Sequence, residues 1–181
     1  MPLQLQSSAS TKSLEVAKTQ IGVKEQGYNR GKIVSQYIKT GGGTIGQSWC
    51  MYFVYWCYNE ASKLLKIKNP LLRTGSCAAQ LKYANSKFSG MKVIKVNGMF
   101  FSGKINSGAI AIFKKGTIYN NDIGKLWLGH TGILEKQINN NTFQLIEGNT
   151  NATGSRNGDG VYTKIRNKNN SKLPILAFIE V

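Results

Sequence analysis

The sequence predicts an α+β fold, and a change in hydrophobic spacing near Gly90 is the main reason. Before Gly90, apolar residues recur at the three- and four-residue spacing of amphipathic helices. After it, short runs rich in Ile, Val and aromatic residues alternate with clusters of Gly and Asn, which is typical of strands and hairpins. Helices followed by strands favour helices packed on one side of an antiparallel sheet.

The chain length fits a single domain. The sequence has 181 residues, and single domains usually hold ~100–200. We therefore expect residues 1–181 to form one domain, and we leave open that residues 1–10 are disordered.

Four helices are expected in the first half of the chain. They cover residues 11–22, 31–39, 49–66 and 75–88. In the first of them, Leu14, Ala17 and Ile21 lie at helical spacing. The third begins near Trp49 and is too continuously apolar for an exposed helix, so we expect it to be central and buried.

Six strands are expected in the second half. They cover residues 92–96, 109–113, 130–135, 142–147, 160–165 and 175–181. An Asn-rich turn joins the third of these strands to the fourth, which predicts an antiparallel hairpin. The polar segments 114–129 and 149–160 are expected to be loops.

The charge balance is strongly basic. Lys and Arg number 24 against 8 Asp and Glu, which gives a net charge of +16. The basic residues are spread from Lys12 to Lys172 without forming a block. Such a field attracts polyanions, for example nucleic acid, an anionic membrane face or an anionic cell-wall polymer. A role in solubility alone is the other interpretation.

Nothing in the sequence predicts insertion into a membrane. No apolar run approaches the ~18–20 residues that a membrane-spanning helix needs. The first twelve residues, MPLQLQSSASTK, lack the basic region and apolar core of a Sec signal peptide. We therefore expect synthesis in the cytoplasm, with release by lysis or by a non-Sec route.

Two glycine-rich segments match nucleotide-binding motifs poorly. Residues 41–46, GGGTIG, fit G-x-G-x-x-G, but a helical segment precedes them and no acidic residue follows in the required context. Residues 27–33, GYNRGKI, lack the spacing and the Ser or Thr of a phosphate loop. We interpret residues 41–46 as a turn that leads to Ser48.

The three cysteines are not equivalent. We expect the Ser48 side chain to cap the third helix, which places Cys50 in its first turn. The N–H groups and partial positive charge of a helix start stabilise a thiolate and can bind an oxyanion. Cys57 follows two turns later among apolar neighbours, and we interpret Cys57 and Cys77 as packing residues. Three scattered cysteines and one histidine indicate neither a disulfide framework nor a zinc site.

A candidate base and a candidate third polar group follow Cys50 along the chain. His130, the one histidine of the sequence, opens a predicted strand, and histidine is the usual base for a thiol near neutral pH. Glu147 and Asn149 are two residues apart, so on the next strand they would point to the same face. One of the two could accept a hydrogen bond from the imidazole, as the third member of a catalytic triad does. The sequence leaves open which one.

Taken together, these segments resemble the CHAP family. CHAP proteins are cysteine- and histidine-dependent amidohydrolases/peptidases of the papain-like clan, which also includes the NlpC-type cell-wall peptidases. The matching pieces are QSWCMYFVYW around Cys50, GAIAIF, GHTGIL around His130, and LIEGN. The resemblance covers about residues 11–181. It departs from the family at Ala109, where Asp is common.

The resemblance implies a papain-like fold and a role for each site residue. Cys50 would be the nucleophile, and His130 would take its proton and then protonate the leaving amine. Glu147 would orient His130, while Asn149 would support the imidazole or the oxyanion. Trp49 and Trp127 flank these segments and could wall a substrate groove, although core packing is favoured for Trp49.

The resemblance also implies a substrate. Such proteins cut amide bonds of peptidoglycan, either N-acetylmuramoyl–L-alanine or peptide bonds within the stem or cross-bridge. No metal or organic cofactor is expected. The expected partner is the anionic bacterial cell wall, with no nucleic acid and no stable membrane insertion.

Two alternative hypotheses remain open at the level of sequence. A non-catalytic basic module that binds a polyanion would make Cys50 dispensable, and its binding would fall steeply with salt. Against it, the aromatic residues lie in an apparent core helix instead of alternating with basic residues. A papain-like amidase that acts on a non-wall amide would share the fold and differ only in substrate.

Overall fold

The computed structural model describes residues 3–96, 101, 103–118, 127–153 and 158–181. The helices of this part are α1 (Leu3–Thr19), α2 (Lys32–Thr40), α3 (Cys50–Leu65) and α4 (Cys77–Ala84). The strands are β1 (Lys92–Lys95), β2 (Ile110–Lys114), β3 (Gly129–Gln137), β4 (Thr142–Thr150), β5 (Gly160–Asn167) and β6 (Ile175–Glu180). The predicted α+β class is therefore confirmed.

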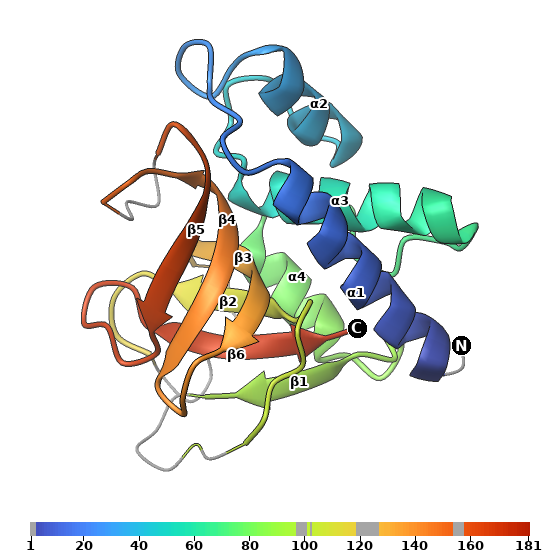
Figure 1. The fold of residues 1–181 in the computed structure, drawn as a ribbon, viewed down its shortest axis with the longest axis vertical. Helices are drawn as coiled ribbons and strands as arrows, with labels where there is room; N and C mark the ends of the chain where they lie inside the picture. The colour runs from blue at the N-terminus through green and yellow to red at the C-terminus, as the bar shows by residue number, and fades with distance from the viewer. Residues whose placement is uncertain (1–2, 97–100, 102, 119–126, 154–157) are drawn as a thin grey trace.

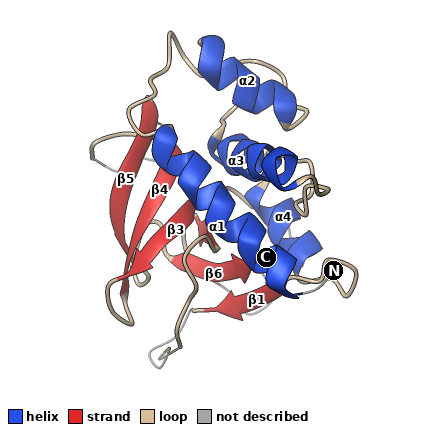
Figure 2. Ribbon diagram, turned by 45° about the vertical axis from the view of Figure 1, so that its right-hand side comes forward, coloured by secondary structure: helices blue, strands red, loops and turns tan. Residues whose placement is uncertain are grey.

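The strands form one six-stranded sheet in the order β1-β6-β2-β3-β4-β5. Every neighbouring pair is antiparallel. The twisted sheet is seen in Figure 1, and Figure 2 shows the helices gathered on one side of it. The predicted hairpin of β3 and β4 is present, with Ile133 opposite Ile146. This hairpin brings the segment after His130 beside the segment that ends in Asn149.

Helix α3 is buried along most of its length, as its apolar composition predicts. Trp49, just before the helix, and Phe53 in its first turn both contact Tyr37 of α2, with ring centroids 5.7 and 5.4 Å apart. Burial of each large apolar side chain contributes about 1.5–3 kcal/mol. The aromatic cluster therefore holds the start of α3, and with it Cys50, in a fixed position.

Strand β2 is buried on both faces, which explains its unbroken apolar run. Ile110 and Ile112 belong to the core between the sheet and the helices. Ala111 and Phe113 point the other way, because side chains alternate along a strand, and pack in a second apolar cluster with Phe143. The sheet therefore has a rigid centre, and β3 beside it carries His130.

Helix α1 extends beyond the N-terminal end of the predicted helix 11–22. Helix α1 begins at Leu3, and its residues Ala9 and Ser10 are buried. The Ser10 hydroxyl lies 3.2 Å from the Tyr58 hydroxyl of α3 and donates to the carbonyl of Val181. Hydropathy alone underestimated this segment, because small residues make its contacts.

Two expected loops are described only in part. Residues 119–126 of the predicted loop 114–129 and residues 154–157 of the predicted loop 149–160 lie outside the described residues.

Candidate active site

Cys50 is the first residue of α3, but Ser48 does not cap the helix. The N-cap position is Trp49, which makes no side-chain capping hydrogen bond, and Ser48 is exposed. A backbone hydrogen bond from the Phe53 N–H to the Trp49 carbonyl closes the first turn of α3. The N–H groups before Phe53 have no partner within the helix. Cys50 thus lies at a helix start, as expected, without the predicted cap.

His130 and Glu147 are in direct contact within the sheet. The Nε2 atom of His130 lies 2.8 Å from Oε2 of Glu147, and both side chains are fully buried. The other ring nitrogen, Nδ1, has no hydrogen-bond partner among the described residues. The ring also packs against Phe113, the residue opposite it on β2. The imidazole is therefore held at one nitrogen and left available for proton transfer at the other.

The glycine of the segment HTG allows Glu147 to reach His130. A Cβ atom at Gly132 would lie only 2.6 Å from Cγ of Glu147 and 2.9 Å from the carbonyl oxygen of Ile146. A larger residue at Gly132 would push β4 away from β3 and lengthen the contact between Glu147 and His130.

Arg166 of β5 is a third charged group of the site, and the sequence did not indicate it. Its Nε donates to Oε1 of Glu147 at 2.7 Å and its Nη2 donates to Oε2 at 2.5 Å. Such a two-point pair fixes the plane of a carboxylate as well as its charge. The guanidinium also lies over the Phe113 ring, 5.6 Å from its centre. Arg166 therefore holds Glu147 in the orientation that meets His130.

The electrostatics of the pair favour a charged imidazole. Burial lowers the pKa of His130, but the charge and hydrogen bond of Glu147, together with the interaction with Cys50, outweigh it and raise the pKa to about 9. Burial raises the pKa of Glu147, but the hydrogen bonds and charges of Arg166 and His130 lower it by more, so the net shift is downward. Glu147 is therefore ionised, and His130 holds a proton at neutral pH.

The Cys50 thiol is shifted toward the thiolate. A hydrogen bond with Cys77 is the largest influence and lowers the pKa of Cys50; burial opposes it, while His130 and the Met51 N–H add to the lowering. The net result is a pKa well below the usual value. Cys57 behaves in the opposite way, because burial first and the charge of Glu60 second raise its pKa well above normal.

Asn149 lies near the site but serves the start of α3 and not His130. The backbone of Asn149 is left-handed, with φ at 57°, and the register with β5 shifts between Glu147 and Thr150. This irregularity breaks the alternation that predicted a shared face with Glu147. With its amide oriented so that both ends meet complementary partners, Asn149 accepts from the Trp49 N–H and donates to the Gly158 carbonyl, each at 3.1 Å.

The sequence Glu147-Gly148-Asn149 thus joins the sheet to the nucleophile helix. A Cβ atom at Gly148 would lie 2.7 Å from ring atoms of both Trp49 and Phe53. Only glycine lets β4 approach α3 this closely, since the space that a Cβ would need is filled by the two rings.

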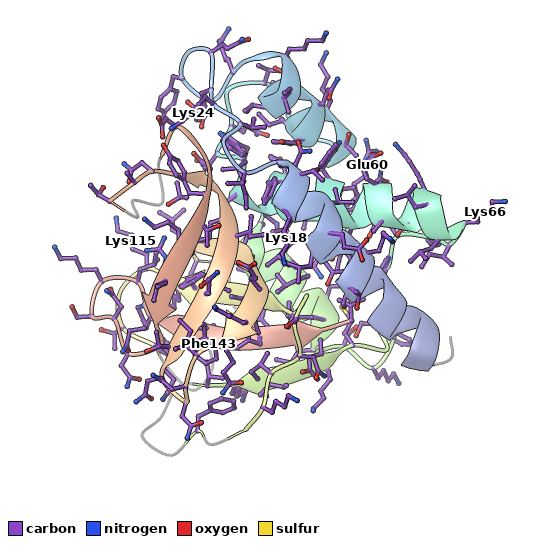
Figure 3. All side chains as sticks on the ribbon, in the orientation of Figure 1. Lys18, Lys24, Glu60, Lys66, Lys115 and Phe143 are labelled. Atoms are coloured by element: carbon purple, nitrogen blue, oxygen red, sulfur yellow. The ribbon has the colours of Figure 1, made fainter. Side chains whose placement is uncertain are left out.

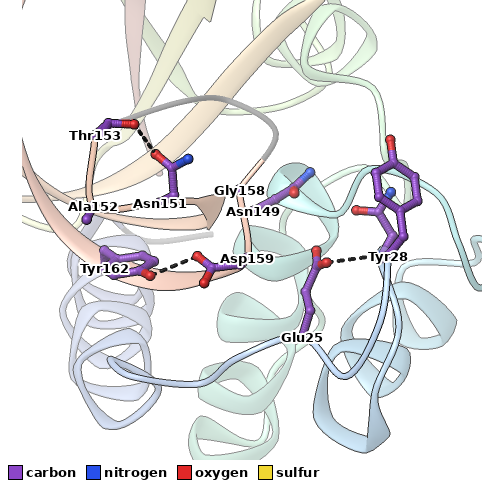
Figure 4. Close-up of a pocket in the computed structure, with 10 residues that line it drawn as sticks. Glu25, Tyr28, Asn149, Asn151, Ala152, Thr153, Gly158, Asp159 and Tyr162 are labelled. Carbon is purple, nitrogen blue, oxygen red and sulfur yellow. Dashed lines mark hydrogen bonds between the residues drawn. The ribbon is translucent and has the colours of Figure 1, made fainter.

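Trp49 is packed in the core, the role that the sequence favoured over a wall of the substrate groove, and it does not line the pocket at Cys50. Its side chain is fully buried, and its Nε1 donates to Oε1 of Glu25 at 2.6 Å. Figure 4 shows Glu25 and Asn149 in the wall of a separate pocket of about 460 Å³, together with Asp159. Trp49 therefore anchors the start of α3 through its bond to Glu25 and its packing on Tyr37.

Cys50 opens into a different pocket, of about 480 Å³, that Trp127 helps to line. Gln47 also lines it, and the amide oxygen of Gln47 accepts from the Tyr52 hydroxyl at 2.9 Å and from the Thr44 N–H at 3.0 Å. These two bonds leave the amide nitrogen of Gln47 as the group free to donate in the pocket. The pocket can therefore admit a polar substrate segment to the sulfur of Cys50.

Cys77 also lines this pocket, so its interpretation as a packing residue was incomplete. It is the first residue of α4, in the same helical position as Cys50 in α3. The reasoning that singled out Cys50, a cysteine at a helix start just after a serine-containing turn, applies equally to Gly75-Ser76-Cys77. Cys57, by contrast, is fully buried in the main core.

A thiol at a helix start, a buried imidazole and a carboxylate that orients it define the class of cysteine-dependent hydrolases with a papain-like arrangement. Comparison with known families agrees, since the CHAP domain model matches residues 41–149. The chain belongs to the CHAP domain family, which comprises cysteine/histidine-dependent amidohydrolases. The matched segment contains Cys50, His130, Glu147 and Asn149, whereas Arg166 follows it. A search of curated proteins finds no match.

Two further structural findings bear on partners and cofactors. Among the described residues, no helix is both long and apolar enough to cross a membrane. Within the same residues, no three His, Cys, Asp or Glu side chains are grouped so as to hold a metal ion.

The pH dependence of activity is expected to follow from the raised pKa of His130. The leaving amine needs the proton of His130, so activity should fall as pH rises through about 9. It should also fall on acidification, when the Cys50 thiolate is protonated. Amine release measured across pH gives the profile, and a rate that keeps rising above about pH 9 would contradict it. The contribution of His130 to folding stability also falls as pH rises. It is fully present below the ordinary histidine pKa of 6.5 and is lost as pH rises through about 9.

Replacing Asn149 with alanine is expected to loosen the start of α3 without changing the titration of His130. Losing two buried hydrogen bonds should cost about 1–3 kcal/mol of unfolding free energy, measured by thermal and urea denaturation. Asn149→Gly is the matched control, because glycine removes the same bonds and tolerates the left-handed backbone. If the alkaline limb of the pH–activity profile moves in either variant, Asn149 interacts with the His130 imidazole and this prediction is wrong.

Proposed function

We propose that this protein hydrolyses an amide bond of bacterial peptidoglycan, with Cys50 as nucleophile and His130 as acid and base. The observation that carries the proposal is the buried pair of His130 and Glu147 beside a thiol at a helix start, in a pocket open to substrate. Membership in the CHAP family supports amide hydrolysis, and the basic charge supports an anionic polymer as the target.

The first half of the reaction forms a thioester. The Cys50 thiolate attacks the carbonyl carbon, and the carbonyl oxygen becomes an oxyanion. Since Nε2 of His130 is held by Glu147, Nδ1 is the nitrogen that gives its proton to the leaving nitrogen as the C–N bond breaks. The amine departs, and the acyl group stays on Cys50.

The second half releases the acid. His130 takes a proton from water, whose oxygen attacks the thioester carbon, and the C–S bond breaks to give a carboxylic acid, which loses its remaining proton to solvent. The Cys50 thiolate and the His130 imidazolium are then both restored. Cys50 and Gln47 both line the pocket, so the proposed donors for the oxyanion are the N–H of Cys50 at the helix start and the amide nitrogen of Gln47.

The basic surface would bring the protein to its substrate. Figure 3 shows Lys18, Lys24, Lys66 and Lys115 on separate parts of the surface, so the charge of +16 acts as a general field and not as one patch. Peptidoglycan and its attached anionic polymers provide a matching negative charge.

Digestion of purified peptidoglycan tests the proposed function. Wild-type protein and Cys50→Ala are incubated with walls of different cross-bridge types, and the soluble fragments are analysed by mass spectrometry. New amino groups are expected with wild type only, and the fragment masses identify the amide that is cut. A different outcome would favour a non-wall substrate: wild-type protein would release no fragment from any wall but would still hydrolyse small synthetic amides.

The strong positive charge also favours a second candidate, a module that binds polyanions without catalysis. Under this hypothesis Cys50→Ala would match wild type in every assay, and binding to walls or nucleic acid would fall steeply with salt. Fragment release that depends on Cys50 decides against it.

A further inference from the structure

A second cysteine lies at the same pocket as the candidate nucleophile. Cys77 begins α4, whose first turn is capped by Ser76, because the Ser76 Oγ accepts from the Ala79 N–H at 3.1 Å. Cys50 begins α3, and both residues line the same pocket. Each is only 6% exposed. The pocket thus holds two sulfurs, each fixed by the start of a different helix.

We propose that Cys77 is a positioning residue for the nucleophile, and that its thiol donates a hydrogen bond to the Cys50 thiolate across the pocket. This inference rests on the proposed role of Cys50 and extends it to a residue on another helix. No local pattern around Cys50 contains it, because Cys77 comes 27 positions later along the chain.

The direction of this hydrogen bond follows from the chemistry of the two sulfurs. An ionised Cys50 has lost its hydrogen and can only accept, so the proton must belong to Cys77. Cys77, His130 and the Met51 N–H all lower the pKa of Cys50, and Cys77 has the largest influence of the three. Burial works against the thiolate, so a buried donor is needed to keep it ionised.

The contact also restricts where the sulfur of Cys50 can lie. A hydrogen bond from a thiol fixed at the start of another helix would limit rotation of the Cys50 side chain about its Cα–Cβ bond. Cys77 would therefore keep the sulfur directed to the pocket, where the substrate carbonyl arrives.

Titration of Cys50 in three variants tests the proposal. The rate of alkylation of Cys50 is followed across pH by mass spectrometry of its peptide in wild type, Cys77→Ala, Cys77→Ser and Cys57→Ala. Loss of the donor in Cys77→Ala is expected to raise the midpoint by about one pH unit, as for a charge-assisted hydrogen bond of moderate strength. Cys77→Ser keeps a donor and is expected to retain most of the wild-type shift. Cys57→Ala, which removes a buried sulfur elsewhere on α3, should leave the midpoint unchanged.

The same set of variants can overturn the proposal. An unchanged midpoint in Cys77→Ala, with wild-type thermal unfolding, would show that Cys77 does not act on Cys50. Equal midpoints in Cys77→Ser and Cys77→Ala, both shifted, would show that lost packing is the cause. Cys77→Val, which keeps the volume without a donor, replaces the alanine variant if the latter unfolds. If Cys50 of the wild-type protein is alkylated with the pH midpoint of an unperturbed cysteine, the result would instead contradict the activated nucleophile of the proposed function.

Discussion

Replacing Cys50 with alanine is expected to lower the rate of wall cleavage by about 10⁴-fold or more, because covalent catalysis is lost entirely. The protein should remain folded, since alanine is a good helix former and Cys50 lies at the first position of α3. The rate is measured as free amine released from purified walls, and folding is checked by circular dichroism.

Cys57→Ala is the matched control for this prediction. It removes a sulfur from the same helix at a fully buried position, so it should lower stability while changing the rate little. Similar rate losses in both variants would mean that disturbance of α3, and not loss of a nucleophile, explains the result. Retention of activity by Cys50→Ala would remove Cys50 from the mechanism.

The second large effect is expected at Glu147. Glu147→Gln keeps the size of the side chain but removes the charge that both His130 and Arg166 contact. The imidazole then loses its orienting partner, and a rate loss of about 10²–10⁴-fold should follow by analogy with other triads. The pKa of His130 should fall from about 9, which moves the alkaline limb of the activity profile to lower pH.

A double variant separates catalysis from stability at this position. Glu147→Gln alone removes the carboxylate that Arg166 contacts and should cost about 3 kcal/mol, the lower end of the range for a broken buried pair, because the Arg166 side chain is still 15% exposed. Adding Arg166→Met removes the buried positive charge that faced Glu147, so part of the stability should return while activity stays low. A double variant that recovered activity would show that Glu147 acts only through the fold. Urea denaturation and amine release measure the two effects.

The sequence was informative wherever neighbours along the chain determine the outcome. The four helices and six strands follow from hydrophobic spacing, although α1 begins at Leu3, well before the predicted helix 11–22. Cys50 at a helix start and His130 at a strand start follow from the same local patterns. The hairpin of β3 and β4 then brings Glu147 to His130, because its register is determined by a short turn and two apolar runs.

Site residues on other elements could not be predicted from the sequence, because tertiary packing alone brings them to the site. Arg166 reaches Glu147 from β5 only because that strand pairs with β4 at the sheet edge. Cys77 lines the same pocket as Cys50 only because the fold brings the start of α4 to that pocket. Nothing in the spacing of either residue relative to the site distinguishes it from an ordinary surface arginine or a buried cysteine.

Backbone irregularity accounts for the remaining corrections. The left-handed residue Asn149 and the register shift beside it turn its side chain from His130 to the Trp49 N–H. Trp49 itself takes the N-cap position without a serine cap and is enclosed by Tyr37 and Glu25. Strand alternation and capping preferences describe regular backbone, so they fail where tertiary contacts bend it.

By itself, the sequence determined the class of fold, the nucleophile candidate at a helix start and the histidine with an acidic partner on the next strand. The tertiary structure alone decided that the acid is Glu147, that Arg166 holds it, and that a second sulfur lies at the pocket. The reason is physical: hydrophobic periodicity is a property of adjacent residues, whereas the charge and hydrogen bonds of a buried site depend on which distant elements pack against it.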